Sequence, residues 1–242
     1  MATTNIDASK QTFARSGTQT SWSAARNATS SNLHTNYTTS QSNRGNAISV
    51  LYSSGRGGGS YYVNRSFFFF DTSTVAGTIT AIDLKIYAAS NGGHSVRVAK
   101  STAYGTSGGS AYTNSDFNNW TALNPISLSP IPYTSAGQTW TALGTNTISL
   151  NSTAISNANS NSYLNLVLVG QLYDYVNSAP GSSLEQSSGI QFASTTEFPK
   201  LAITYTPTPS GYGNDVNGVA SANIASVNGV ATANIASINS VT

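Results

Sequence analysis

Short β-branched and aromatic runs alternate along this chain with clusters of glycine, proline and asparagine, and helical periodicity is almost absent. The clearest run is residues 79–87 (ITAIDLKIY), in which Ile82, Leu84 and Ile86 share one face and charged residues lie on the other. This two-residue period is typical of a half-buried strand. Many such runs without intervening helices predict an all-β protein, an antiparallel β sandwich or jelly roll.

Six other runs predict further strands. They are residues 47–52, 61–70, 96–99, 147–150, 163–169 and 201–205. The first two flank the turn sequence SSGRGGGS, so we expect them to pair with each other. Only residues 153–158 (TAISNA) favour a helical turn in this region, and we therefore expect little helix.

Changes in composition divide the chain into four segments. Residues 1–45 are polar and aperiodic, which predicts an N-terminal arm with one or two strands. Residues 46–206 hold the strand runs and are expected to form the sandwich. Residues 207–215 contain Pro207, Pro209 and two glycines, which is typical of a linker. Residues 216–242 form a repeat tail.

The tail repeats with a period of 11 residues. The copies VNGVASANIAS and VNGVATANIAS are followed by a partial copy, INSVT. The recurring aliphatic residues are Val216, Val219, Ile224, Val227, Val230, Ile235, Ile238 and Val241. Two and a half copies cannot bury a core of their own. We therefore expect these side chains to dock on a neighbouring chain, as an oligomerisation or docking element.

Three conformations are open to the repeats. An 11-residue period suits a right-handed helical coil, but glycine and asparagine disfavour a helix. Extended segments with Asn-Gly turns, which add strands to a partner, suit the composition better. A disordered tail that arose by repeat slippage is the third, although low charge and regular aliphatic spacing are unusual for such tails. We favour the extended form.

Charged residues make up only 7% of the chain, against roughly 25% in an average soluble domain. Such a surface is typical of fibres, shells and adhesins rather than of cytosolic enzymes. The ten basic residues are scattered, so we expect no nucleic-acid binding. Residues 1–11 lack the features of an export signal, and the longest apolar run, residues 163–169, is too short to cross a bilayer. We therefore expect neither conventional export nor membrane insertion.

Residues suited to catalysis or metal binding are scarce. The chain has eight acidic residues, two histidines and no cysteine, and it contains no nucleotide-binding or metal-binding motif. We therefore expect no enzymatic activity, no metal site and no cofactor. Six aromatic residues are candidate stacking platforms for a glycan, although core packing is the commoner use of such side chains: Tyr104, Tyr112, Trp120, Trp140, Tyr173 and Tyr175. Of these we select Trp120, Trp140, Tyr173 and Tyr175 as possible glycan-binding residues.

Two stretches carry a family resemblance. The first, residues 61–87, combines Arg65 in an aromatic strand with Phe70-Asp71, Ile79–Ala81 and the strand Leu84–Tyr87. The second, residues 197–205, has a proline before a leucine and ends in Ile-Thr-Tyr. Residues 50–206 thus resemble jelly-roll domains of the DNRLRE type. The resemblance implies a fold similar to carbohydrate-binding modules, and display or binding rather than catalysis. The tail resembles VNGVA-x-ANI repeats of phage and bacterial surface proteins.

Three functions fit these patterns. The first is a structural virion protein, such as a head or tail fibre or a decoration protein, located on the virion surface. Its partners would be copies of itself, with a trimer favoured, or other virion proteins. The second is a carbohydrate-binding or adhesive module of a bacterial surface protein, which would bind a cell-surface glycan. The third is an extracellular filament, in which the tail of one subunit completes the sheet of the next. We favour the first, because a virion protein leaves its host by assembly and lysis and needs no export signal.

Overall fold

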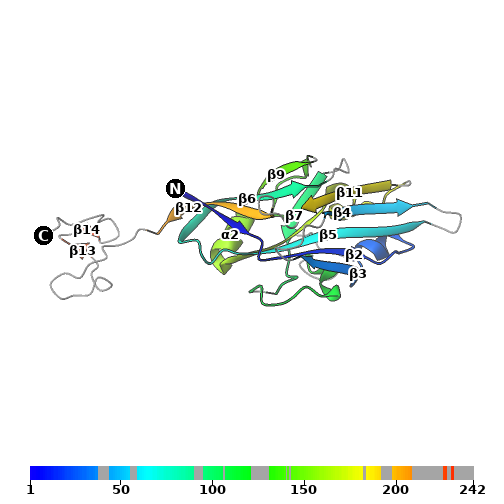
Figure 1. Ribbon diagram of the computed structural model, residues 1–242, viewed down its shortest axis with the longest axis horizontal. Helices are drawn as coiled ribbons and strands as arrows, with labels where there is room; N and C mark the ends of the chain where they lie inside the picture. Colours follow the sequence, from blue (N-terminus) through cyan, green and yellow to red (C-terminus); the bar gives the residue numbers. More distant parts are fainter. Residues whose placement is uncertain are drawn as a thin grey trace.

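The fold is built almost entirely from antiparallel strands (Figure 1). The structure is a computed structural model that describes residues 1–37, 44–54, 59–89, 95–105, 107–120, 131–139, 141, 143–181, 184–191, 198–208, 226–227 and 230–231. Most of the described residues belong to one twelve-stranded sheet, which folds over its own core. The prediction of an antiparallel, all-β sandwich is confirmed at this level.

The strands of the large sheet run through the chain from the second residue. They are β1 (Ala2–Asp7), β2 (Lys10–Ser16), β3 (Ser31–Tyr37), β4 (Arg44–Ser53), β5 (Ser60–Asp71), β6 (Gly77–Ala88), β7 (Ser95–Lys100), β8 (Gln138–Thr139), β9 (Gly144–Ser149), β10 (Tyr163–Gly170), β11 (Leu184–Gln191) and β12 (Lys200–Pro207). The main path of the sheet is β1-β12-β6-β11-β4-β5-β10-β7-β8; β2 pairs with β3 and β5, and β9 pairs with β6.

Short helices connect some of these strands. They are α1 (Trp22–Arg26), the 3-10 helix η1 (Asn114–Asn118), α2 (Ser152–Asn161) and the π-helix η2 (Gln171–Tyr175). The predicted helical turn at residues 153–158 is confirmed and lies inside α2. The side chain of Asn151 caps this helix by accepting a hydrogen bond from the backbone N–H of Ala154. The small side chains of Ala154 and Ala158 let the helix pack closely on the core.

All seven predicted strands are confirmed, including the antiparallel pairing of β4 with β5. β5 is central because it pairs with β4 through residues 60–64, with β10 through residues 66–71 and with β2 through residues 64–69. The polar sequence of β11, LEQSSGIQ, carries no alternation that could have predicted this strand. Its pairing with β4 is a backbone interaction that does not require apolar side chains.

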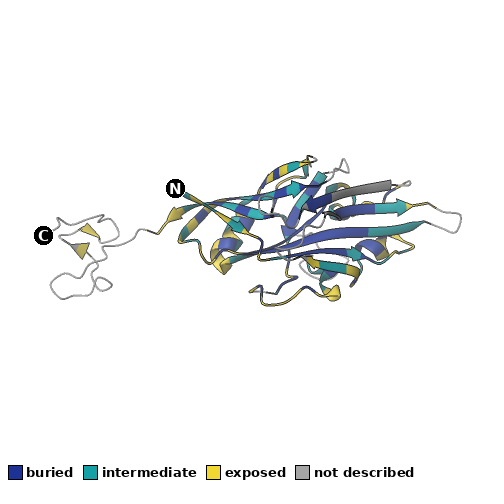
Figure 2. Cartoon of the chain, viewed as in Figure 1, coloured by how far each residue is buried: buried dark blue, intermediate teal, exposed yellow. Residues whose placement is uncertain are grey.

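β5 is buried on both faces, which explains its four consecutive phenylalanines (Figure 2). Phe68 and Phe70 belong to a first core cluster, shared with apolar residues of β6, β10 and β12. Phe67 and Phe69 belong to a second cluster, covered by α1, η1 and the segment after β7. Because successive side chains of a strand point to opposite faces, a strand covered on both sides reads as an unbroken apolar run.

The structure corrects the predicted N-terminal arm of residues 1–45. β1 pairs with β12, and β2 is inserted between β3 and β5, so the sandwich begins at Ala2 rather than at residue 46. The polar composition was misleading because β2 buries Gln11 and Thr12 as well as Phe13 and Ala14. At the other end, β12 extends to Pro207, and residues 209–215 of the predicted linker lie outside the described residues.

Candidate functional site

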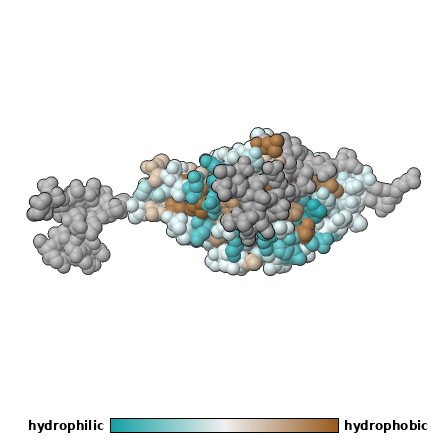
Figure 3. Space-filling view, viewed as in Figure 1, coloured by the Kyte–Doolittle hydropathy of each residue, from teal (hydrophilic) through white to brown (hydrophobic). Residues whose placement is uncertain are grey.

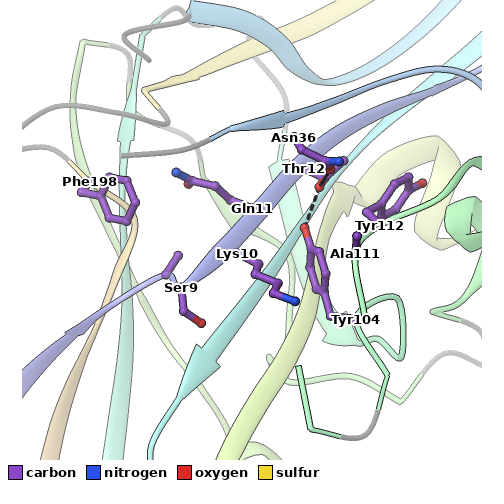
Figure 4. A pocket seen from close by; sticks show the side chains of 10 residues that line it. Ser9, Lys10, Gln11, Thr12, Asn36, Tyr104, Ala111, Tyr112 and Phe198 are labelled. Atoms are coloured by element: carbon purple, nitrogen blue, oxygen red, sulfur yellow. Dashed lines mark hydrogen bonds between the residues drawn. The ribbon is translucent and has the colours of Figure 1, made fainter. Parts of the chain in front are cut away.

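A cleft of about 320 Å³ opens beside the start of β2 (Figure 4). It is formed by β2 with the turn before it, the end of β3, the segment that follows β7 and the residue that precedes Pro199. The lining residues are Ala8, Ser9, Lys10, Gln11, Thr12, Asn36, Tyr104, Ala111, Tyr112 and Phe198. Tyr104 and Tyr112 were among the aromatic residues that the sequence offered as stacking platforms, and the other lining residues were not candidates.

A chain of hydrogen bonds shapes one wall of the cleft. The hydroxyl of Tyr104 donates to Oγ1 of Thr12 at 2.7 Å, and Oγ1 of Thr12 donates to Oδ1 of Asn36. A hydroxyl group has only one proton to donate. Thr12 accepts a hydrogen bond from Tyr104 and uses its own hydroxyl proton to donate to Asn36. The carbonyl oxygen of Asn36 is therefore held against Thr12.

The two tyrosines of the cleft are almost completely buried. Tyr104 is 1% exposed and Tyr112 is 3% exposed. Burial raises the pKa of the Tyr104 phenol, and the hydrogen bond with Thr12 opposes this shift only in part. Burial likewise raises the pKa of the Tyr112 phenol. Both phenols therefore stay protonated, and they bring no negative charge to the cleft.

Lys10 is the charged residue of the cleft. Its Nζ donates to the carbonyl oxygen of Ser110 at 2.7 Å. None of the other lining residues is acidic, and the ion pairs found among the described residues all involve Asp174. The ammonium group of Lys10 is thus held by a neutral acceptor and forms no ion pair among the described residues.

A buried ion pair holds together the cover of the second core cluster. Arg65 on β5 donates to both carboxylate oxygens of Asp174 on η2, with Nε to Oδ2 and Nη2 to Oδ1 each 2.8 Å. Both side chains are 0% exposed. The same guanidinium donates to the carbonyl oxygens of Phe117 at 3.1 Å and Arg26 at 2.6 Å. One side chain therefore joins β5 to α1, η1 and η2.

Trp120 belongs to this buried cluster rather than to a binding surface. The centre of its ring lies 4.9 Å from the guanidinium carbon of Arg65 and 5.7 Å from that of Arg26. The residue is 2% exposed. The interaction of a cation with an aromatic face accounts for this packing. The prediction that Trp120 offers an open platform to a sugar is wrong, because the ring is covered by protein.

Arg26 adds a second cation to the cluster. Its Nε donates to the backbone carbonyl of Asp174 at 2.7 Å and lies 3.8 Å from Oδ1 of the same residue. Burial lowers the pKa of the Arg26 guanidinium; the carboxylate of Asp174 opposes this shift, and the charge of Arg65 adds to it. Two guanidinium groups thus share one carboxylate, so the cluster depends on Asp174.

Of the other predicted glycan residues, the structure describes Tyr173 and Tyr175, which share no open platform with the buried Trp120. Tyr173 and Tyr175 lie on η2, on either side of Asp174, and both are half-buried against the second core cluster. The guanidinium carbon of Arg97 lies 4.6 Å above the ring of Tyr175. Trp140 lies outside the described residues.

Part of the repeat tail forms a strand pair of its own. β13 (Ser226–Val227) pairs with β14 (Val230–Ala231), and Asn228 and Gly229 separate the two in the sequence. These four residues are extended rather than helical, and the addition of the repeats to a partner stays a prediction. The other predicted docking residues lie outside the described residues: Val216, Val219, Ile224, Ile235, Ile238 and Val241.

The strand pair leaves an aliphatic side chain accessible, since Val230 is 49% exposed. Within the described part of the chain, β13 and β14 pair only with each other and not with the large sheet. An isolated two-stranded hairpin is marginally stable in water at best. A surface that covers Val230 would therefore stabilise this part of the tail.

Sequence reasoning missed the buried charges and the cleft for different reasons. In a chain with so few charges, an acidic residue between two tyrosines and an arginine next to four phenylalanines are a usable signal for a buried ion pair. Asp174 and Arg65 could have been found in this way. Lys10 and Asn36 stand among ordinary polar residues, and no pattern marks them.

No group of three potential metal ligands occurs among the residues that the structure describes. No helix in the same part of the chain is long and apolar enough to cross a membrane. In comparisons with known proteins, the chain matches no family model and no curated protein.

Proposed function

We propose that this chain is a structural protein of a virion, such as a head or tail fibre or a decoration protein, which displays its sandwich and docks through its C-terminal repeats. The observation that carries the proposal is the β13–β14 pair, an isolated strand pair with the exposed aliphatic side chain of Val230. The repeated Val and Ile positions would be covered by copies of the same chain, with a trimer favoured, or by another virion protein.

The sandwich supports a display role. Most of its large hydrophobic residues are packed in two core clusters within one chain, with Leu33, Leu143, Leu172 and Val176 exposed, so the domain does not require a partner to complete its core. On the face seen in Figure 3, the described residues are mostly hydrophilic or neutral, with only small hydrophobic patches. A molecule with such a surface would associate through its tail rather than through its sandwich.

The jelly-roll topology and the DNRLRE likeness are part of this proposal. The likeness is supported by Arg65, one of the residues that carry it, because this residue is the centre of the buried ion-pair cluster. A residue with that role constrains three separate segments at once. A location on the virion surface follows from the proposed display role and from the low charge of the chain.

The test compares the full-length chain with variants of its repeats. We expect the mass in solution, measured by light scattering, to be a small multiple of the chain mass. The double variant Val227→Ser and Val230→Ser should shift the mass towards the monomer without changing the thermal unfolding of the sandwich. The matched control is Thr232→Ser, which places at this position the serine that the preceding copy has, and should leave the mass unchanged.

Two outcomes would count against this proposal. A full-length chain that stays monomeric at high concentration would remove the oligomeric role, unless a virion partner is shown to bind the repeats. An open-ended polymer in electron micrographs would favour the filament instead.

A second candidate function is a carbohydrate-binding or adhesive module of a bacterial surface protein. The observation that favours it is the cleft beside β2, in which an amide and an ammonium group face apolar side chains. This function predicts that the isolated chain binds a glycan without assembling, so ligand titration of a monomeric variant distinguishes it from the first.

A further inference from the structure

The cleft beside β2 offers hydrogen-bond donors whose directions are set by the protein itself. Oδ1 of Asn36 accepts from Thr12, which leaves the two N–H groups of Nδ2 for a ligand. Nζ of Lys10 uses one of its three N–H groups on the carbonyl of Ser110. Figure 4 shows both side chains beside the hydrogen bond between Tyr104 and Thr12. These donors suit a ligand that is rich in hydrogen-bond acceptors. Because the protein already holds them in place, binding loses little side-chain entropy.

The charge of the cleft favours an anionic ligand. Lys10 is cationic, and none of the lining residues is acidic; the carboxylate of Asp116, which acts electrostatically on Tyr104 and Tyr112, is not one of them. A ligand carboxylate would receive charge-assisted hydrogen bonds, which are shorter and stronger than those between neutral groups. A neutral ligand would leave the ammonium group without a counter-charge in a partly enclosed site.

Part of the cleft lining is apolar. Ala8, Ala111 and Phe198 contribute carbon atoms to it, together with the rings of Tyr104 and Tyr112. A small inorganic anion would make no use of these carbon atoms, whereas a sugar ring has a C–H face that packs against them. The volume of about 320 Å³ is near the lower end of the range for ligand sites, roughly 300–1,000 Å³, so the occupant is small.

We propose that this cleft binds a sugar that carries a carboxylate, such as a uronic acid residue of an acidic polysaccharide. The carboxylate lies at Lys10, a ring hydroxyl or the ring oxygen accepts from Nδ2 of Asn36, and the ring packs on the side of Phe198. The proposal rests on the second candidate function, carbohydrate binding, and gives it a ligand class and a site.

The test titrates the full-length chain with a matched pair of ligands at low salt. Methyl glucuronide and methyl glucoside differ only in whether C6 is a carboxylate. We expect calorimetry and saturation-transfer NMR to show binding of the glucuronide at about 10 mM ligand or below, and an affinity for the glucoside at least about tenfold weaker. Added salt should weaken the binding of the glucuronide.

Two variants locate the site. Asn36→Asp keeps the shape of the side chain and the acceptor for Thr12, but replaces the N–H donors by a negative charge. Lys10→Met removes the ammonium group. Each should lower the affinity by at least about tenfold. The matched control is Asn32→Asp, which makes the same charge change at an exposed residue of β3 outside the cleft and should leave the affinity unchanged.

Four outcomes would overturn the proposal. The first is that the chain binds none of glucuronide, galacturonide and N-acetylneuraminate, and the second is that it binds glucuronide and glucoside with equal affinity. The third is that Asn36→Asp binds the glucuronide as tightly as the native chain does. The fourth is that acetate binds as tightly as the glucuronide. None of these results tests the virion proposal, because that proposal is tested by the mass of the repeat variants in solution. If the chain proves to be a monomer, its binding of the glucuronide can still be measured.

Discussion

The Asp174→Asn substitution removes the negative charge that two buried guanidinium groups share, while it keeps the shape of the side chain. In the native structure both carboxylate oxygens of Asp174 accept from Arg65 at 2.8 Å, and the Nε of Arg26 lies 3.8 Å from one of them. An asparagine offers one acceptor oxygen, and its N–H groups would face an N–H donor of Arg65. The substitution therefore leaves a buried cation with an unsatisfied donor.

The expected cost follows from the burial of the pair. Removing one partner of a buried ion pair costs about 3–5 kcal/mol, because the other charge remains in a low-dielectric site. Both side chains are 0% exposed here, so no solvent screens the uncompensated charge. Natural domains have a free energy of unfolding of about 5–15 kcal/mol. We therefore expect Asp174→Asn to remove roughly a fifth or more of the free energy of unfolding of the sandwich.

Urea unfolding followed by tryptophan fluorescence measures this loss. The ring of Trp120 packs against the guanidinium of Arg65, so its emission reports on the site as well as on global unfolding. In a double-mutant cycle with Arg65→Met, the double variant should cost less than the sum of the single variants by about 2 kcal/mol or more. The control is Arg97→Met, a half-buried arginine that stacks on Tyr175 and should cost about 1 kcal/mol.

Two results would refute this reasoning. A loss below about 1 kcal/mol for Asp174→Asn would show that the carboxylate is not needed to balance the guanidinium groups. Strict additivity of the two single variants would show that Arg65 and Asp174 do not interact energetically, whatever their distance.

Three further predictions concern the core. Burial raises the pKa of Tyr104, so above pH of about 10 the folded chain keeps a proton that the unfolded chain loses, and the free energy of unfolding should fall as the pH rises. Tyr104→Phe should reduce this slope in urea titrations by about 1.4 kcal/mol per pH unit, and an unchanged slope would contradict the burial of the phenol. Phe67→Ala and Phe68→Ala should each cost about 3–5 kcal/mol in the same assay, because both faces of β5 are packed; a small loss for either would show an unpacked face. Gly108→Ala should lower the free energy of unfolding by more than about 1 kcal/mol in thermal unfolding, because the new Cβ would lie 2.3 Å from the ring of Phe69 and the φ of this residue is +70°. The control Gly109→Ala should change it by no more than about 0.5 kcal/mol.

The β class and the main strands were predictable because burial of one strand face leaves a two-residue period in the sequence. Residues 79–87 show this period, and they form the half-buried strand β6. The same rule explains the failures. β1 and β2 pair through their backbones while their side chains are largely polar, so their sequence reads as an arm. An unbroken aromatic run predicted β5, but it could not tell what covers each face.

Local sequence was thus sufficient for the antiparallel β fold and for α2, since both depend on neighbouring residues and turn chemistry. The ion-pair cluster and the cleft were settled by tertiary structure alone. Arg65 and Asp174 are 109 residues apart, and the cleft joins the start of β2 to Asn36, Tyr104 and Phe198. The aromatic neighbours of Arg65 and Asp174 signal burial but not which residue each one pairs with, and Lys10 and Asn36 have the surroundings of exposed residues within their own segments. The partner and the remaining hydrogen-bond donors of each side chain are defined only when the sheet brings the distant segments together.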